Sequence, residues 1–129
     1  MESTSSINYP LLTYNSLYNL DREEKKIKIL QELPEEFYKA LDKFFIDKKK
    51  NLEKLKNEND LDKIKKEKNI LKNSEKLSKE ILNLRCIKIS TIAIQNQIYG
   101  ENTLNPINMI DKEKEFYISI KKLMEKMNN

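Results

Sequence analysis

The chain of 129 residues contains a single glycine, Gly100, and this scarcity constrains the fold more than any other feature. Turns between antiparallel β-strands need positive φ angles, which glycine adopts most readily. One glycine cannot serve the many turns of an all-β fold, so that class is excluded. A chain of this length is expected to form one domain and to remove roughly two thirds of its surface from water on folding.

Helical spacing of apolar residues predicts two helices in the first half of the chain. Thr13 is expected to cap a short first helix that runs into the charged segment 21–26. Pro34, followed by two acidic residues, favours the start of a second helix, and the polar segment 57–60 is expected to end it.

A long, lysine-rich third helix is predicted from Leu61 to Tyr99, with Gly100 as the residue that follows its last turn. The segment 87–94 within it is rich in β-branched residues, which by propensity alone favours a strand. We predict helix, because no turn residues flank the segment and no second strand is available for pairing. Asp111 is expected to cap a final helix, which gives an all-α bundle of about four helices.

The predicted organisation is a flexible leader over residues 1–11 and a single α-helical domain over 12–129. The apolar stripes predict a core made of Phe37, Leu41, Phe44, Ile81, Phe116, Ile120 and Leu123. The only cysteine, Cys86, lies in the apolar stretch 84–89 and is expected to be a buried thiol in a reducing compartment. No apolar run approaches the roughly 20 residues of a membrane span, so a soluble, intracellular protein is expected.

The absence of histidine removes most familiar catalytic and metal-binding templates, which depend on an imidazole group. Neither a phosphate-binding loop nor a metal-ligand cluster is present in the sequence. Acidic residues at positions 23, 24, 35, 36, 113 and 115 are interpreted as solvated or as favourable charges near helix ends. We therefore predict no catalytic, cofactor-binding or metal-binding residue, and a protein that is not an enzyme.

The formal charge of +4 is concentrated in the middle of the chain, where residues 39–88 hold 16 basic and 9 acidic side chains. This excess indicates either a solvated face or a surface for nucleic acid or an acidic partner. Lys48, Lys49 and Lys50 are the candidate phosphate contacts. No aromatic residue lies between Ile46 and Ile98, so base stacking is not expected and only weak, sequence-independent contact is predicted.

Six tyrosines in a chain without tryptophan indicate a surface for association. Tyr38 and Tyr117 directly follow Phe37 and Phe116, so each is rotated by about 100° from the predicted core stripe of its helix. The predicted subunit interface is made of Tyr14, Tyr18, Tyr38, Tyr117 and Met124.

Several motifs together resemble the helical domain of archaeal GINS subunits of the class in which that domain precedes a small β domain. The segment Leu33-Pro34-Glu35-Glu36-Phe37-Tyr38 resembles the opening of the main helix of the family. Arg85-x-x-Lys88-Ile89 followed by Ala93 is similar to its basic and apolar helix. The loop and last helix of the family are matched by Tyr99-Gly100, Asn105-Pro106, Asn108-Met109, Glu113-x-Glu115-Phe116-Tyr117 and Leu123-Met124. The resemblance covers roughly residues 12–127.

The resemblance implies a non-catalytic scaffold subunit of a GINS-like DNA replication complex, built as a homo- or hetero-tetramer. It further implies partners at the replication fork, the MCM helicase and a RecJ-like protein, in the cytoplasm or nucleoid of an archaeon or the nucleus of a eukaryote. The β domain of the family would need further chain beyond Asn129, so contacts made through it are not carried over. The lysine-rich part of the third helix has no counterpart among these motifs.

Two other functions compete with the scaffold. One is a sequence-independent nucleic-acid-binding helical protein that uses the lysine-rich middle of the chain. The other is a generic coiled-coil adaptor, which fits the long third helix but not the paired aromatic residues Phe37-Tyr38 and Phe116-Tyr117.

Overall fold

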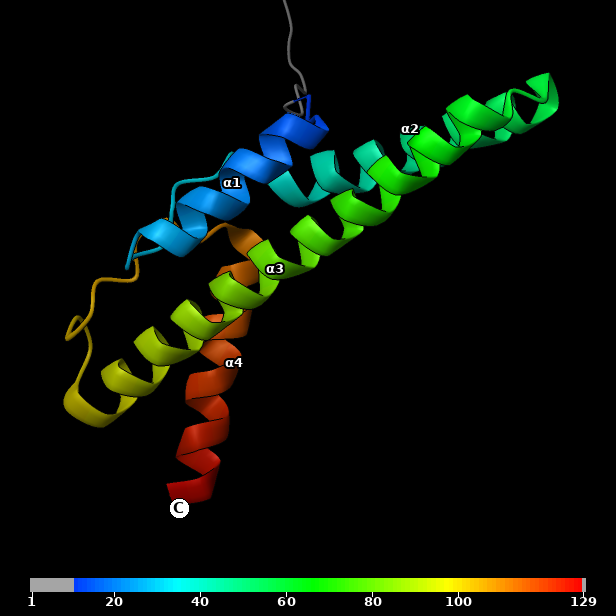
Figure 1. Cartoon of the computed structure of the whole chain (residues 1–129). Helices are drawn as coiled ribbons and strands as arrows, with labels where there is room; N and C mark the ends of the chain where they lie inside the picture. The colour runs from blue at the N-terminus through cyan, green and yellow to red at the C-terminus, as the bar shows by residue number, and fades with distance from the viewer. Residues whose placement is uncertain (1–10, 129) are drawn as a thin grey trace, which may run out of the picture. The chain divides into compact units, whose positions relative to one another are not determined.

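The computed structural model describes residues 11–128, and within that range the chain forms four α-helices and no strand (Figure 1). Their bounds are α1 Tyr14–Lys26, α2 Phe37–Glu58, α3 Leu61–Tyr99 and α4 Asp111–Asn128. The predicted all-α class with one long helix is confirmed. Of the predicted leader, residues 1–10 lie outside the described range, and Leu11 is exposed.

The predicted cap of α1 is confirmed in detail. The Thr13 hydroxyl accepts a hydrogen bond from the Ser16 backbone N–H at 3.0 Å, and the Thr13 backbone N–H donates to the Ser16 hydroxyl at 3.2 Å. This reciprocal pair satisfies amide groups that have no partner inside the helix. Thr13 therefore fixes where α1 begins.

The second helix begins three residues later than Pro34 favours. Residues 35 and 36 form a turn, and α2 starts at Phe37. Its end agrees with the predicted break, because Asn59 adopts a left-handed conformation (φ 58°) and its N–H donates to the Lys56 carbonyl. Asparagine tolerates this conformation better than most residues, which favours a helix end here.

The segment 87–94 is helical, as predicted, and α3 continues to Tyr99. Gly100 follows with a φ of +107°, and its N–H donates to the Asn96 carbonyl at 3.0 Å. Asp111 is the first residue of α4 rather than its cap. Ile110 holds the cap position, since its carbonyl accepts hydrogen bonds from the Glu113 and Lys114 N–H groups at 2.8 and 3.0 Å. The Glu113 carboxylate reaches back and accepts a hydrogen bond from the Ile110 N–H at 3.2 Å.

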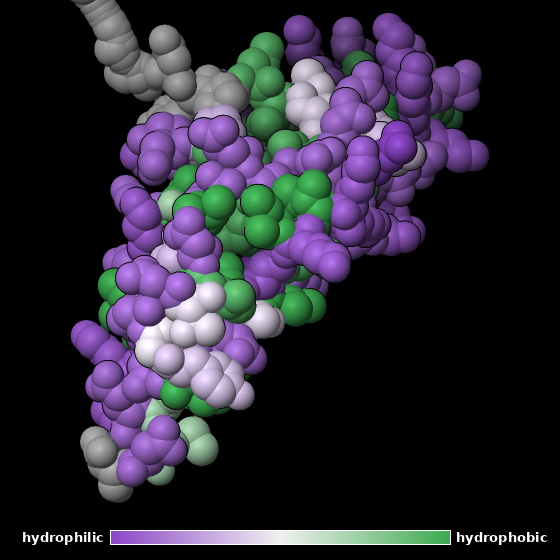
Figure 2. All heavy atoms as spheres, turned by 90° about the vertical axis from the view of Figure 1, so that its left-hand side faces the viewer, coloured by the Kyte–Doolittle hydropathy of each residue, from purple (hydrophilic) through white to green (hydrophobic). Residues whose placement is uncertain are grey.

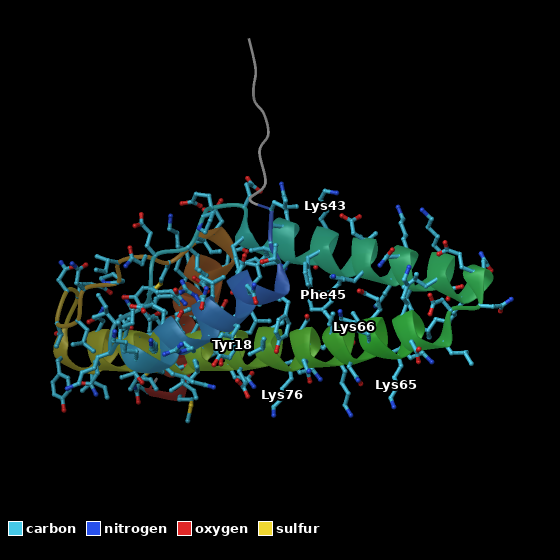
Figure 3. All side chains as sticks on the ribbon, turned by 45° about the horizontal axis from the view of Figure 1, so that its top comes forward. Tyr18, Lys43, Phe45, Lys65, Lys66 and Lys76 are labelled. Atoms are coloured by element: carbon cyan, nitrogen blue, oxygen red, sulfur yellow. The ribbon has the colours of Figure 1, made fainter. Side chains whose placement is uncertain are left out.

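The chain divides into two compact units. Unit 1 contains Met1–Leu20 and Glu36–Lys79, and unit 2 contains Asp21–Glu35 and Glu80–Asn129. The single domain over 12–129 stays a prediction. In unit 1, α2 and the first part of α3 lie side by side in opposite directions (Figures 1 and 3). The buried apolar residues of this unit are Leu17, Phe37, Ala40, Leu41 and Phe44.

The core of unit 2 is formed by Leu30, Ile89 and Met109, with Ile92 and Tyr117 packed against them. The prediction that Phe116 and Leu123 belong to the core is wrong, because their side chains are 37% and 60% exposed. The expected burial of Cys86 is also wrong, since its thiol is exposed. Across residues 11–128, none of the helices combines the length and the apolar character that crossing a bilayer requires.

Candidate functional site: a buried ion network and the apolar surfaces of unit 2

A fully buried arginine, Arg85, organises unit 2. Its Nε and one terminal nitrogen donate to the two carboxylate oxygens of Glu113 at 2.6 and 2.7 Å. The remaining hydrogen bonds reach Glu24 Oε1 and the carbonyl oxygens of Gln31 and Asn108, at 2.8 to 2.9 Å. A guanidinium group carries five N–H bonds, and each has an acceptor here. Arg85 thus joins α3 to α4, to the end of α1 and to the segments beside them.

Lys88, one turn farther along α3, binds the C-terminal end of α1. Its ammonium nitrogen lies 2.6 Å from Glu24 Oε2 and 2.7 to 2.9 Å from the carbonyl oxygens of Glu24, Ile27 and Ile29. The last carbonyl groups of a helix lack partners inside it and carry partial negative charge. A cation at this position therefore stabilises the end of α1 and fixes the direction of the chain after it.

The buried charges of this network balance, with Arg85 and Lys88 opposite Glu24 and Glu113. Burial raises the pKa of the Glu24 carboxyl, but hydrogen bonds from Lys88, Arg85 and Gln31 together outweigh it and hold the pKa below its ordinary value. Burial lowers the pKa of Arg85, and the two carboxylates more than compensate, so this pKa is raised. The shifts of Glu24 and Arg85 both favour the charged forms of these two groups, and the network holds the helices of unit 2 together.

A second polar cluster fixes the loop between α3 and α4. The side-chain amide of Asn96 donates to the Leu104 carbonyl and to the Tyr117 hydroxyl, both at 2.9 Å, and its oxygen accepts from the Leu104 N–H at 2.8 Å. Lys121 lies over the Tyr117 ring, 5.3 Å from its centre, and forms an ion pair with Glu101. These contacts hold the loop against both helices.

A groove of about 360 Å³ lies beside Lys88 in unit 2. Its lining is largely aliphatic and includes Ile29, Ile87, Ile92, Leu104 and Ile107. Figure 2 shows the side of the molecule on which the loop 100–110 lies, where apolar side chains form patches between hydrophilic ones. Unit 2 thus presents apolar surface to solvent next to its buried network.

The apolar stripe of α4 is the second exposed apolar surface. Phe116, Ile120, Leu123 and Met127 share one helix face, and Leu123 and Met127 are 60% and 86% exposed. Figure 1 shows α4 diverging from α3 toward its C-terminal end. Glu113, which Arg85 binds, and Tyr117, one turn later, determine which face of α4 packs against the rest of unit 2. This choice of face explains why Phe116 and Leu123 are exposed and Ile120 is half-buried, although all three were predicted for the core.

The residues predicted for the subunit interface are distributed over both units. Tyr14 and Tyr38 are half-buried in unit 1, where Tyr38 meets Phe37 edge to face with ring centres 5.5 Å apart. Tyr18 is 46% exposed. In unit 2, Tyr117 packs against the core and Met124 is half-buried. The predicted subunit interface stays a prediction.

The three lysines predicted as phosphate contacts are not equivalent. Lys48 points toward the ring of Phe44, 5.7 Å from its centre, and lies 3.7 Å from Glu67 of α3. Lys49 and Lys50 are exposed on other faces of α2, because successive helical residues are about 100° apart. Consecutive positions do not form one cationic surface here.

Sequence reasoning missed the network. Glu24 and Glu113 were interpreted as solvated or as favourable charges near helix ends, and Glu113 does lie in the first turn of α4. Both are buried, at 0% and 4% exposed, where Arg85 binds both of them and Lys88 binds Glu24. One signal was available, since only two of the 25 basic residues are arginines and Arg85 lies in an apolar stretch. A buried bidentate pair favours arginine over lysine. Among residues 11–128, no group of acidic or cysteine side chains is arranged to hold a metal ion.

No known protein family, curated protein or solved structure matches this chain. The resemblance to GINS subunits therefore stays an expectation from the sequence, while the geometry of unit 2 shows what those motif residues do within this chain.

Proposed function

We propose that this protein is a non-catalytic scaffold subunit of a GINS-like DNA replication complex, in which it links the MCM helicase to a RecJ-like partner. The proposed partners in the complex are other GINS-like subunits, as a homo- or hetero-tetramer. The protein would then act in the cytoplasm or nucleoid of an archaeon, or in the nucleus of a eukaryote.

The observation that carries the proposal is the exposed apolar stripe of α4. Phe116, Leu123 and Met127 are large apolar side chains, and together they present one continuous line to solvent over three turns. Contiguous apolar surface of this kind typically marks a protein–protein interface. A helix that shows such a face while its other side binds Arg85 and the unit 2 core is suited to joining subunits.

The positions of the motif residues support the link to GINS subunits. The Arg85 and Lys88 motif on α3 meets the Asn108-Met109 and Glu113 motifs through hydrogen bonds and core contacts. Motifs that are far apart in the sequence thus form one structural unit. This arrangement supports the interpretation of those motifs as the determinants of a helical fold rather than of a catalytic site.

The proposal is tested by capturing the tagged protein from its own cells and identifying the bound proteins by mass spectrometry. We expect other GINS-like subunits and the MCM helicase. A second capture with Leu123→Glu should lose the other subunits, because a carboxylate on the stripe opposes burial in an apolar interface.

Ile118→Glu is the matched control, because Ile118 is 50% exposed on the same helix and lies about 140° or more around it from every residue of the stripe. This control should retain the partners. Capture of no replication protein, or equal capture by Leu123→Glu and by the control, would contradict the proposal.

A further inference from the structure

Five lysines of unit 1 lie on one face of α3. Lys65, Lys68, Lys72, Lys76 and Lys79 follow one another at intervals of three, four, four and three residues, which places them within about 80° of the helix circumference. All five are exposed. Figure 3 shows Lys65 and Lys76 projecting from α3 on the side away from α2, whereas Phe45 and Lys66 lie between the two helices. We call these five residues the α3 lysine stripe.

Most neighbouring lysines of unit 1 are engaged with acids, and the stripe is not. Lys39, Lys43, Lys48, Lys56 and Lys63 each form an ion pair with an acidic residue of this unit. Within residues 11–128, none of the five stripe lysines has such a partner. The stripe therefore carries a positive charge that no acidic side chain of residues 11–128 pairs with directly.

The acids that alternate with these lysines in the sequence do not lie among them in space. Glu67 is on the opposite face, where it pairs with Lys48 of α2. Asp62 and Glu75 project along the two edges of the stripe, about 60° to 80° from Lys65 around the helix. These acids therefore reduce the positive potential at the edges of the stripe and not at its centre.

We propose that the α3 lysine stripe binds the phosphodiester backbone of nucleic acid without reading its sequence. The stripe spans about 21 Å, a length over which one strand of a duplex presents about six phosphates. Its charged groups are all ammonium ions, which bind phosphate as point charges. No aromatic or apolar side chain interrupts them between Lys65 and Lys79 on this face, so the stripe offers neither base stacking nor the apolar anchor of a protein interface.

This proposal is independent of the scaffold function, because the stripe belongs to unit 1 and the apolar surfaces described above belong to unit 2. It also places phosphate contact on α3 instead of on Lys48, Lys49 and Lys50. A subunit with such a stripe would hold nucleic acid beside the proteins that it joins.

The test compares two triple variants of the full chain that lose the same charge. The stripe variant is Lys68→Gln, Lys72→Gln and Lys76→Gln, and the control is Lys49→Gln, Lys50→Gln and Lys54→Gln on α2. All six positions are exposed. Circular dichroism and thermal melting first test whether both variants keep the fold. Fluorescence anisotropy then measures binding to a labelled duplex and to a labelled single strand over a series of salt concentrations.

For five duplex contacts, the logarithm of the affinity should fall with the logarithm of the salt concentration with a slope of about −4.5, or about −3.5 for a single strand. For the stripe variant, which removes three contacts, the slope should be less steep by about 2 to 3. This variant should also bind at least about tenfold more weakly at low salt. For the control variant, the slope should become less steep by less than about one. Either a duplex or a single strand as the preferred form supports the proposal.

Three outcomes would overturn it. One is the absence of binding by the wild type at low salt. Another is equal loss by the stripe variant and the control, which would indicate a general effect of net charge. The third is stripe-dependent binding of a polyglutamate peptide with no binding of either nucleic acid, which would assign the surface to an acidic protein.

Discussion

Arg85 shows how one side chain determines the arrangement of several segments. The group is buried, its two carboxylate partners come from α1 and α4, and its carbonyl partners come from the segments next to those helices. Removing such a charge from water is costly, and only a complete set of acceptors offsets that cost. The complete set is present, so the network defines one arrangement of these segments.

Replacing Arg85 by lysine should destabilise the protein strongly. A lysine has three N–H bonds on one nitrogen and cannot bind Glu113 at two points while also reaching Glu24 and the carbonyl oxygens. Leaving buried carboxylates without full partners typically costs about 3 to 5 kcal/mol. Urea denaturation measures this loss in the free energy of unfolding.

Arg22 provides the control, as the only other arginine and an exposed one. Arg22→Lys should change the free energy of unfolding by less than about 0.5 kcal/mol. Equal stability of Arg85→Lys and Arg22→Lys would show that the network does not stabilise the fold.

Glu24 should make stability depend on pH in acid. Its pKa is lower in the folded protein than in the unfolded chain, so the unfolded chain binds more protons as the pH falls. The stability due to this carboxylate is complete above the ordinary pKa of about 4.3 and is lost as the pH falls through the folded value. Unfolding measured over a pH series should show this decline, and Glu24→Gln should reduce the slope. An unchanged slope in Glu24→Gln would contradict the assignment.

At the scale of the element, α3 illustrates how context overrides propensity. Its segment 87–94 has the composition of a strand, yet Ile81, Arg85, Ile89 and Ala93 turn inward at intervals of four residues, and Lys88 lies three residues after Arg85. This periodicity matches a helix that packs through one face. Two residues of this inward face, Arg85 and Lys88, are charged, so a search of the sequence for apolar residues alone does not include them.

Two isoleucines of α3 distinguish helix from strand directly. Ile89 is 1% exposed and Ile87 is 64% exposed, although residues two apart would share a face in a strand. Ile89→Ala should cost about 2 to 5 kcal/mol, whereas Ile87→Ala should cost less than about 0.5 kcal/mol. Thermal or urea denaturation measures both. Similar losses in the two variants would contradict the helical assignment of this segment.

Three helix ends, the start of α1 and the ends of α2 and α3, were predictable because local chemistry determines them. Thr13, Asn59 and Gly100 act within one turn of the helix that they begin or end, so their effect is visible in a short window of sequence. The inward face of α4 was not predictable in this way. Its apolar stripe identifies Phe116 and Leu123 as one face, but the pairing of Glu113 with Arg85, 28 residues away in the sequence, decides which face is buried.

The candidate cationic surface was also only partly predictable from the sequence. The lysine-rich composition predicted a cationic region, but the choice of Lys48, Lys49 and Lys50 rested on adjacency in sequence. On a helix, intervals of three and four residues bring side chains together, and adjacent positions separate them. The α3 lysine stripe follows that spacing, whereas the run on α2 does not.

At the scale of the whole molecule, the two units carry different kinds of surface. Unit 1 presents the α3 lysine stripe, and unit 2 presents the aliphatic groove and the apolar stripe of α4. Apolar area left in contact with water favours association, because the hydrophobic effect scales with the area removed from water. The proposed scaffold function uses the surfaces of unit 2, while the proposed contact with nucleic acid uses unit 1.

The measurement that tests the scaffold proposal most directly is the mass of the native assembly that contains this chain, determined by native mass spectrometry after gentle isolation from its own cells. The chain itself has a mass of 15.4 kDa. We predict a defined complex of several subunits for the wild type and for Ile118→Glu, and a species of 15.4 kDa for Leu123→Glu. A wild-type chain that is isolated as a 15.4 kDa monomer would contradict the account.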